Sequence, residues 1–228
     1  MTLEVLADPQ ATAERAAAII AADARAAAGA RGKFSMAVSG GHTPWVMLRA
    51  LANQDVPWAT VQVFQVDERV APDGDPNRNL THLYESLLVH APITREQIHA
   101  MPVNLPDLDA SAKEYAATLE KLLGRPAVLD LAHLGLGPDG HTASLVPGDP
   151  VLNVTDRDVA ATGVYMGHRR MTMTYPMLNR SRKILWLLTG AEKAAMLPRL
   201  QAGDPTIPAG RIGSAQAFVL ADKAAAGQ

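Results

Sequence analysis

Short apolar runs alternate along this chain with longer, helix-like stretches, of which 11–28 is rich in the helix formers Ala, Glu and Arg. The apolar runs predict strands, at residues 34–38, 61–66, 98–101, 128–136, 171–175, 183–188 and 218–220. The longer stretches predict helices, at residues 11–28, 44–52, 80–88, 110–123 and 191–200. Strands separated by helical stretches of about ten to fifteen residues are typical of βαβ units. The pattern therefore predicts an α/β fold, with a doubly wound, mainly parallel, Rossmann-like sheet and helices on both faces.

Neither an internal repeat nor a long polar linker interrupts this alternation. Residues 1–228 are therefore expected to form a single α/β domain, since the length is within the usual range for one domain. The least regular stretch is 147–167, where Pro and Gly separate short apolar pieces. If a small segment departs from the main sheet, we expect it in this stretch.

The composition narrows the classes of function. Hydrophobic residues make up 48% of the chain, enough to build a substantial core. A net charge of −2 gives no general attraction for nucleic acid or membranes. The absence of cysteine excludes disulfides, thiolate metal sites and a cysteine nucleophile. The amino terminus does not resemble a signal peptide, and no apolar run approaches the ~20 residues of a membrane span. We therefore expect a cytoplasmic protein that binds neither nucleic acid nor membranes. We expect it to be a monomer or a small homo-oligomer.

The most informative part of the chain is the segment 133–145, His-Leu-Gly-Leu-Gly-Pro-Asp-Gly-His-Thr-Ala-Ser-Leu. An apolar run ends abruptly there, so the next polar side chains, Asp139 and His141, should emerge at the carboxyl edge of the sheet. Ligands bind at that edge in open α/β folds. Imidazole is the side chain best suited to moving protons near neutral pH. His133 lies inside the apolar run and is expected to be packed in the core.

A glycine-rich loop joins a predicted strand to a predicted helix at 39–44, with the sequence Ser-Gly-Gly-His-Thr-Pro. Its glycines let backbone N–H groups approach a ligand closely, and the start of the helix adds the positive end of its dipole. This combination suits an oxyanion such as phosphate, although the Gly-Lys-Ser/Thr ending of a Walker loop is absent. An ordinary strand-to-helix turn capped by Thr43 is the other interpretation.

Three charged residues, Asp67, Glu68 and Arg69, directly follow a predicted strand. Neighbouring side chains on an extended chain point to opposite sides, so one of these three can point into a cleft. A strand end that is simply exposed to solvent would have the same sequence pattern. Two further cations, Arg170 and Lys193, stand beside predicted elements. Each alone is typical of a surface charge, but together with the glycine-rich loop they would form a phosphate clamp.

Several other kinds of site are disfavoured by their surroundings. The sequence Gly-x-Gly-x-x-Gly at 135–140 matches a dinucleotide loop, but a proline and an aspartate occupy its turn positions and Pro147 interrupts any long helix after it. The acidic stretch 73–84 lacks the glycine and the glutamate of a calcium loop. A mononuclear metal site is disfavoured because only one histidine, His141, lies in such a turn. The G-x-S-x-G elbow of serine hydrolases is absent.

Together these motifs resemble the glucosamine-6-phosphate isomerase/6-phosphogluconolactonase family, and within it the lactonases. The resemblance depends on the glycine-rich loop, on Asp67-Glu68-Arg69, on Gly-x-Gly-Pro-Asp-Gly-His-Thr-Ala-Ser-Leu-x-Pro-Gly at 135–148, on Arg-Met-Thr-Met-Thr at 170–174 and on Gly-Ala-Glu-Lys at 190–193. Their order and spacing match over nearly the whole chain. Two departures are His42, where the lactonases usually have serine, and 166–168, which lacks the prolines often found before 170–174.

The resemblance implies hydrolysis of 6-phospho-D-glucono-1,5-lactone to 6-phosphogluconate, the second step of the oxidative pentose phosphate pathway, with no cofactor and no metal. It implies that His141 acts first as general base and then as general acid. Asp139 would orient His141 or the attacking water. Asp67 would lie opposite in the cleft, and Arg69 would stabilise charge on the carbonyl oxygen. Five residues are assigned to the substrate and its phosphate: Gly40, Gly41, Thr43, Arg170 and Lys193.

Two other functions stay open at this point. A glucosamine-6-phosphate deaminase-like isomerase would share the first two motifs in looser form, although it has an Asp-Glu-Tyr type sequence in place of Asp67-Glu68-Arg69. A non-catalytic sugar-phosphate sensor would bind 6-phosphogluconate without hydrolysing the lactone. A sensor would more plausibly carry a DNA-binding segment, and the sequence shows none.

Overall fold

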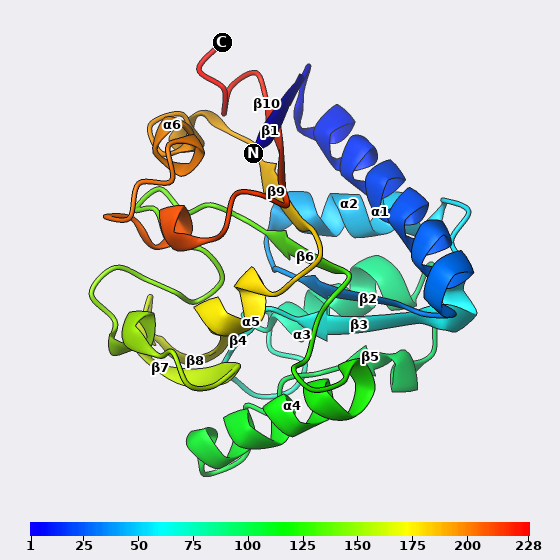
Figure 1. Ribbon diagram of the computed structural model, residues 1–228, viewed down its shortest axis with the longest axis vertical. Coiled ribbons are helices and arrows are strands. Elements are labelled where there is room, and N and C mark those ends of the chain that lie inside the picture. The colour runs from blue at the N-terminus through cyan, green and yellow to red at the C-terminus, as the bar shows by residue number, and fades with distance from the viewer.

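A parallel sheet of seven strands runs through the middle of the protein, which a computed structural model describes over residues 1–228 (Figure 1). In spatial order the strands are β1 (Thr2–Leu6), β10 (Ala217–Asp222), β9 (Ile184–Leu188), β6 (Leu131–Leu134), β2 (Phe34–Val38), β3 (Val61–Gln65) and β5 (Ile98–His99). Each neighbouring pair is parallel. The predicted doubly wound, mainly parallel sheet is confirmed.

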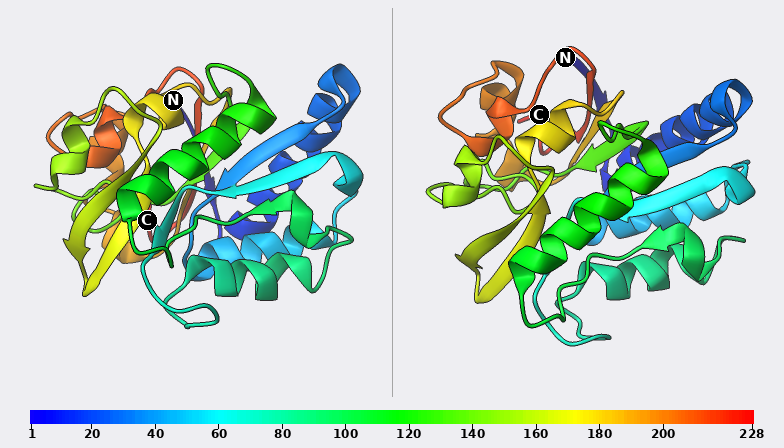
Figure 2. Two further views of the ribbon diagram at one scale, coloured as in Figure 1. Left: turned by 90° about the horizontal axis from the view of Figure 1, so that it is seen from below. Right: turned by 60° about the horizontal axis from the view of Figure 1, so that its bottom comes forward.

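Helices cover both faces of this sheet (Figure 2). They are α1 (Pro9–Arg31), α2 (His42–Ala52), α3 (Asn79–Leu83), α4 (Leu108–Leu123), α5 (Tyr175–Asn179) and α6 (Leu197–Gln201). The long helix α1 begins where the Asp8 carboxylate accepts a hydrogen bond from the Ala11 N–H, and ends at Gly32, whose positive φ suits a glycine. Helices α1 and α2 pack together on one face of the sheet, and α4 lies on the other.

The strands of the large sheet point alternate side chains into two separate cores. On β2, Met36 packs toward α1 and α2, while Ala37 faces the core under α4. On β9, Leu185 and Trp186 divide in the same way. A sheet that is buried on both faces needs apolar residues on both sides, which explains why these strands appear in the sequence as continuous apolar runs.

A second, antiparallel sheet lies beside the first. Its strands are β4 (Asp67–Arg69), β8 (His168–Met173) and β7 (Val159–Tyr165), in that order. Val66 joins the two sheets, because its N–H donates to the Val38 carbonyl at 3.1 Å and its own carbonyl accepts from the Met173 N–H at 2.7 Å. The chain that leaves the large sheet at β3 therefore continues into the small one, and places β4 at the boundary between them.

Two predicted elements differ from those in the structure. The helix expected at 191–200 is a short 3₁₀ turn, Ala191–Lys193, followed by α6. The reason is Pro198, which has no N–H to donate to the Ala194 carbonyl as a continuous helix requires, and which lies instead in the first turn of α6. The strand expected at 171–175 begins earlier, as β8, and Tyr175 starts α5 instead.

Other differences are additions to the predicted elements. The helix expected at 80–88 is α3 followed by a π-helical turn, Tyr84–Leu88. The stretch 147–167, which the sequence marks as irregular, contains a 3₁₀ turn at Pro150–Asn153 and the whole of the strand β7. The edge strand β1 is only partly buried, so it has no apolar run by which the sequence could reveal it.

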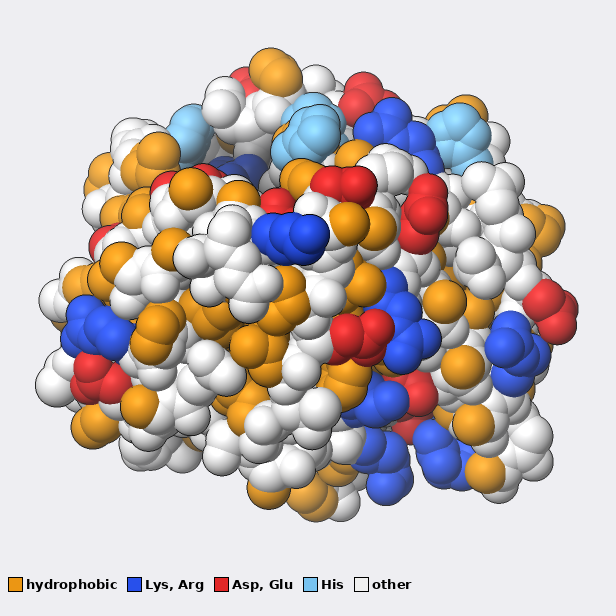
Figure 3. Space-filling view, turned by 90° about the horizontal axis from the view of Figure 1, so that it is seen from above, with side chains coloured by type: hydrophobic (Ala, Val, Ile, Leu, Met, Phe, Trp, Pro, Cys, Tyr) orange, Lys and Arg blue, Asp and Glu red, His pale blue; other side chains and the backbone are white.

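The surface carries charges of both signs, and Figure 3 shows basic and acidic side chains interspersed on one face. None of the helices combines the length and the apolar character needed to cross a bilayer. The large apolar side chains that remain exposed are Val89, Leu105, Val164 and Met166. The last two flank Tyr165, at the tip of the hairpin formed by β7 and β8.

Candidate active site

One cavity, of about 310 Å³, lies at the carboxyl ends of four adjacent strands, β9, β6, β2 and β3. The chain adds β3 and β5 on one side of β2, and β6, β9 and β10 on the other, so the strand order reverses between β2 and β6. Ligands in open α/β folds bind at such a switch point. The residues singled out from the sequence that line this cavity are Gly40, Gly41, Thr43, Asp67, Arg69, His141, Arg170 and Lys193. Asp139 does not line it but contacts His141.

The glycine-rich loop, residues 39–44, is closely confined. A Cβ atom on Gly40 would overlap the side-chain amide of Asn79, so only glycine fits there. Gly41 precedes α2 with a φ of 126°, a conformation that residues with side chains rarely adopt. The Ser39 hydroxyl donates to the His133 carbonyl at 3.0 Å. The loop thus presents the start of α2, whose first N–H groups have no intrahelical partner, to the cavity.

His133, which the sequence places in the core, is fully buried in β6. Burial lowers the pKa of His133 to about 4. The ring is therefore neutral near neutral pH, and its Nδ1 accepts a hydrogen bond from the Ser39 N–H at 3.3 Å. This histidine supports the glycine-rich loop and does not line the cavity.

Asp67 is nearly fully buried at the wall of the cavity, and neutral groups hold it in place. Its Oδ2 accepts a 2.6 Å hydrogen bond from the Ser144 hydroxyl. The side-chain N–H of Asn79 donates to the backbone carbonyl of Asp67 at 3.0 Å. The side-chain oxygen of Asn79 accepts from Nη1 of Arg69 at 2.8 Å. Asn79 and Ser144 therefore orient the two charged residues of β4 that face the cavity.

Two arginines lie side by side at the cavity. Arg69 on β4 is paired directly with Arg170 on β8, and like charges that face each other across two strands repel. The Nε atoms of both are buried without a hydrogen-bond partner. Burial is the main cause that lowers the pKa of Arg170; the charge of Asp67 opposes it and that of Arg69 adds to it. A bound anion in the cavity would relieve the repulsion between the two guanidinium groups.

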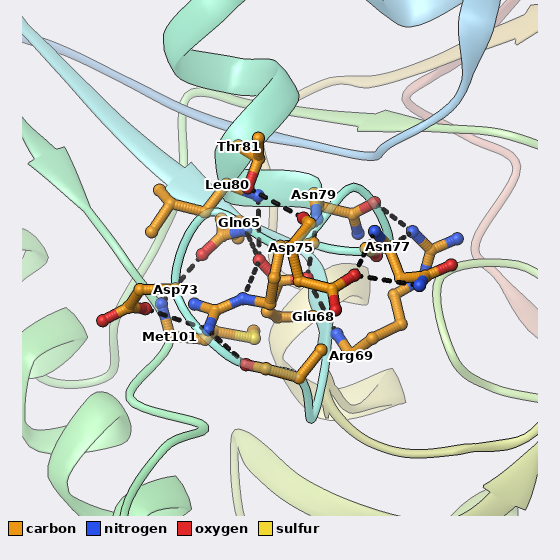
Figure 4. A network of polar contacts seen from close by, with 12 residues as sticks. Gln65, Glu68, Arg69, Asp73, Asp75, Asn77, Asn79, Leu80, Thr81 and Met101 are labelled. Carbon is orange, nitrogen blue, oxygen red and sulfur yellow. Dashed lines mark hydrogen bonds and ion pairs between the residues drawn. The ribbon is translucent and has the colours of Figure 1, made fainter.

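Behind the cavity, Glu68 organises the loop that follows β4 (Figure 4). Its donors, each at 2.8 Å, are the backbone N–H groups of Arg69, Asn79 and Leu80 and the side-chain amide of Gln65. Nε of Arg78 lies 3.1 Å from the same carboxylate and completes a buried ion pair. Because Glu68 binds both ends of the loop, it fixes where Arg69 and Asn79 enter the cavity.

His141 and Asp139 form a hydrogen-bonded pair. Nδ1 of His141 lies 2.5 Å from Oδ1 of Asp139, which also accepts from the His141 backbone N–H at 3.1 Å. The turn between them is tight, since a Cβ atom on Gly137 would overlap the imidazole. Because Asp139 holds Nδ1, the proton of the neutral ring lies there and Nε2 carries the lone pair. Nε2 makes no hydrogen bond within the protein, and the residue lines the cavity.

The charge of Asp139 matters for this pair. Burial acts to raise the pKa of Asp139, but hydrogen bonds from His141 and from the Tyr165 hydroxyl, the latter at 3.0 Å, leave that pKa below its ordinary value. An ionised Asp139 keeps the imidazole in one tautomer and would stabilise an imidazolium. The pair therefore has the geometry of a general base whose reactive nitrogen is available at the cavity.

The 3₁₀ turn Ala191–Lys193 brings a third cation to the cavity wall. Nζ of Lys193 lies 3.5 Å from the carboxylate of Glu192, which is largely exposed. Thr43 and Thr189 also line the cavity, and a 2.6 Å hydrogen bond between their hydroxyls ties the glycine-rich loop to the end of β9. With three cations against two acidic side chains, the lining favours an anionic ligand.

Two of the disfavoured alternatives can be compared with the structure. The Gly-x-Gly-x-x-Gly segment at 135–140 leads into a turn and a bridge between Thr142 and Leu145, so it lacks the helix start that holds a pyrophosphate in dinucleotide sites. The histidines and acidic residues do not gather in groups of three that could hold a metal ion.

Three residues of the site are not singled out by the sequence: Asn79, Ser144 and Tyr165. Ser144 lies within the motif at 135–148 and Asn79 lies ten residues after Arg69, and neither position carries a signal beyond a short polar side chain near charged ones. Tyr165 comes from the stretch 147–167, and no local pattern connects it with Asp139. Such contacts depend on how two sheets meet, which a pattern along the chain does not record.

Comparison with known proteins gives one family over nearly the whole chain. Residues 7–220 match the family model described as glucosamine-6-phosphate isomerases/6-phosphogluconolactonase. A 6-phosphogluconolactonase of Synechocystis is 36% identical over 204 residues, which covers 88% of this chain and 85% of that protein. A 6-phosphogluconolactonase of Mycobacterium tuberculosis is 35% identical over 215 residues, which covers 88% of this chain and 87% of that protein.

The solved structures agree in fold. The crystal structure of 6-phosphogluconolactonase from Thermotoga maritima matches with a TM-score of 0.86 at 26% identity, and the match covers 97% of this chain and 98% of that one. The similarity therefore extends over nearly the whole length of both chains.

Proposed function

The chain belongs to the glucosamine-6-phosphate isomerase/6-phosphogluconolactonase family, and from that membership we propose that it hydrolyses 6-phospho-D-glucono-1,5-lactone to 6-phospho-D-gluconate, a step of the oxidative pentose phosphate pathway. The observation that carries the proposal is the free Nε2 of His141 at a cavity that also contains Arg69, Arg170 and Lys193. Hydrolysis of a phosphorylated lactone requires both a group that transfers protons and a site for an anion.

The phosphate is assigned to the end of the cavity formed by the glycine-rich loop. Gly40 and Gly41 allow close approach to the backbone, and the start of α2 adds unpaired N–H groups and the positive end of its dipole. Thr43, Arg170 and Lys193 supply a hydroxyl and two cationic donors. These groups bind the substrate and place its lactone carbonyl near His141.

The chemistry needs one proton to be moved twice. Nε2 of His141 takes a proton from water as the water oxygen attacks the lactone carbonyl carbon. The tetrahedral intermediate then collapses, the bond between that carbon and the ring oxygen breaks, and the Nε2–H returns the proton to the ring oxygen. Asp139 holds the ring in the required tautomer and stabilises its charged form between the two transfers. The product acid ionises in water, and His141 is again neutral.

Negative charge develops on the carbonyl oxygen during the attack. Arg69 is assigned to that charge, since it lines the cavity and Asn79 fixes its guanidinium. Asp67 lies on the same strand and lines the same cavity, and we assign it to orienting the attacking water or a sugar hydroxyl. Fixed donors of this kind do not need to reorganise as the charge forms.

The setting of the protein is part of the same proposal. We assign it to the cytoplasm, as a monomer or small homo-oligomer whose residues 1–228 form one domain, with neither nucleic acid nor membrane as a partner. A net charge of −2 supports the absence of a nucleic-acid partner. The core under α4, which takes residues from both sheets, supports the single domain. A phosphorylated substrate does not cross a bilayer unaided, which supports action where the substrate is formed.

A lactonase assay tests the proposal. Freshly made 6-phospho-D-glucono-1,5-lactone is coupled to 6-phosphogluconate dehydrogenase, and spontaneous ring opening is subtracted. We expect a rate that rises in proportion to the protein added. A rate equal to the spontaneous one would overturn the proposal. Release of ammonia from glucosamine 6-phosphate would then indicate the deaminase, and binding of 6-phosphogluconate without turnover would indicate a sensor.

A further inference from the structure

Tyr165 contacts both the proton-transferring pair and a cation of the anion site. Its hydroxyl donates to Oδ2 of Asp139 at 3.0 Å and lies 3.4 Å from Nδ1 of His141. Its ring meets the His141 ring edge-on, with centroids 5.3 Å apart. The guanidinium of Arg170 lies over the Tyr165 ring, 5.0 Å from its centroid. Tyr165 itself is not part of the cavity lining, so its role is to hold other residues.

The hairpin that carries Tyr165 is built to place it. Tyr165 pairs with His168 across a two-residue turn, Met166-Gly167, in which both residues have positive φ, as in a type I′ hairpin turn. The register between β7 and β8 shifts between Ala161 and Val164, which twists the end of the hairpin. Because Val164 and Met166 on either side are exposed while Tyr165 is not, only the tyrosine turns toward Asp139.

The two oxygens of Asp139 have separate partners. Oδ1 is occupied by the ring and the backbone N–H of His141, and Oδ2 is occupied by the Tyr165 hydroxyl. Without Tyr165 the carboxylate would be held on one side only, and could rotate about its Cβ–Cγ bond. The orientation of the His141 ring depends on that carboxylate.

We propose that Tyr165 is a positioning residue for lactone hydrolysis, which fixes the Asp139–His141 pair through its hydroxyl and Arg170 through its ring. This inference depends on the proposed function, because it assigns Tyr165 a part in that reaction. The hydroxyl remains a donor at neutral pH, since burial, the hydrogen bond to Asp139 and the charge of that carboxylate all raise the pKa of Tyr165.

The variant Tyr165→Phe removes the hydroxyl and keeps the ring. We expect kcat to fall about tenfold, as for loss of a hydrogen bond to a charged group, while KM stays the same because Arg170 keeps its partner ring. We also expect the acid limb of the kcat/KM profile to move to higher pH. A carboxylate that has lost a donor holds the proton of its partner imidazolium more tightly, so more alkaline conditions are needed to free the base.

Several charged or titratable groups from other elements surround His141 at the cavity: His42 on α2, Asp67 and Arg69 on β4, Arg170 on β8, and Glu192 and Lys193 on the 3₁₀ turn. The Phe variant leaves all of them in place. The matched control is Tyr84→Phe, since the Tyr84 ring also carries an arginine, Arg95 at 4.9 Å, but it does not line the cavity. This control should retain wild-type kinetics and pH profile. Tyr165→Leu, which also removes the ring, should raise KM as well.

An NMR titration of the His141 ring gives a readout that does not need activity, with the resonance assigned by its loss in His141→Gln. The midpoint of this titration should move to higher pH in Tyr165→Phe and not in Tyr84→Phe. Wild-type kcat together with an unmoved midpoint would overturn the role of Tyr165. If the wild-type protein failed to hydrolyse the lactone, the proposed function and the role of Tyr165 in catalysis would both be wrong. The NMR result would still decide whether Tyr165 positions the Asp139–His141 pair.

Discussion

Single side chains in the cavity have separable tasks, and His141 shows this most clearly. Its Nδ1 is bound to Asp139, while its Nε2 is free. In the proposed mechanism its replacement removes proton transfer without removing a phosphate ligand. We expect His141→Ala to lose about 10²–10⁴-fold in kcat and to bind 6-phosphogluconate as the wild type does. Coupled assays and calorimetric titration with the product measure the two quantities. Wild-type turnover in this variant would show that another group is the base.

Lys193 is expected to behave in the opposite way. In the proposed mode of binding it contributes a point charge to the phosphate, and the phosphate carries the same charge in the ground state and in the transition state. Lys193→Ala should therefore raise KM by roughly 10- to 100-fold, the range for loss of a hydrogen bond to a charged group, with kcat little changed. Lys121→Ala, an exposed lysine on α4, is the control and should have wild-type kinetics. A fall in kcat at unchanged KM would place Lys193 at the reacting carbonyl instead.

At this scale the sequence predicts the residues that directly follow a strand and misses those that arrive from elsewhere. Asp67, Asp139 and His141 stand after apolar runs, so a parallel sheet brings them to one edge. Tyr165 belongs to the second sheet, and its contact with Asp139 arises only because the β7–β8 hairpin lies against the loop after β6. The existence of such a contact depends on the relative placement of two sheets.

At the scale of elements, the glycine-rich loop is the most constrained part of the site. A Cβ atom on Gly40 would displace the Asn79 amide, and with it the hydrogen bonds to Arg69 and to the Asp67 carbonyl. We expect Gly40→Ala to lower kcat/KM strongly and to cost about 1–3 kcal/mol in the free energy of unfolding, as overpacking does. Urea unfolding and the lactonase assay measure the two effects.

The matched control for this prediction is Gly29→Ala in helix α1. Gly29 has open space around its Cβ position, and it lies within the helix, where alanine is the better helix former. This variant should gain about 0.5–1 kcal/mol in the free energy of unfolding and keep full activity. If both glycine variants behaved alike, the close approach of Gly40 to Asn79 would not be the reason for glycine in the loop.

Elements were predictable where one physical signal dominated. The buried strands of the large sheet have continuous apolar runs, the long helices α1 and α4 are rich in good helix formers, and the structure confirms these elements. The helix expected at 191–200 is wrong because good helix formers there outweighed Pro198 in the interpretation. Strand β7 is missed because its exposed end beside Gly163 and Gly167 gives no apolar run.

For the whole molecule, the alternation of elements along the chain predicts the type of sheet but not the order of the strands within it. The alternation of strands and helices indicates a parallel sheet, and the structure has one. The same alternation is compatible with many strand orders, because every buried parallel strand has the same continuous apolar pattern. The observed order places β6 beside β2, so the loops that carry His141 and Gly41 meet although they are far apart in sequence.

The stability of the whole molecule should depend on pH through His133. In the unfolded chain this histidine titrates near pH 6.5, whereas burial lowers its pKa to about 4 in the folded protein. Between these two pH values the histidine is protonated in the unfolded state but not in the folded state. The free energy of unfolding is therefore highest above about pH 6.5 and falls as the pH drops toward 4. The difference of about two and a half units corresponds to a loss of about 3 kcal/mol.

Urea unfolding at a series of pH values measures this loss. His133→Asn keeps an acceptor for the Ser39 N–H but cannot titrate, so its stability should fall less steeply over the same interval, even if its packing makes it less stable at every pH. His90→Asn, at an exposed histidine, should follow the wild-type curve. The smaller fall in stability that remains in His133→Asn should include a contribution from His99, whose pKa burial also lowers. An unchanged slope in His133→Asn would mean that the ring beneath the glycine-rich loop is already charged in the folded protein, and that it could not accept the hydrogen bond from Ser39.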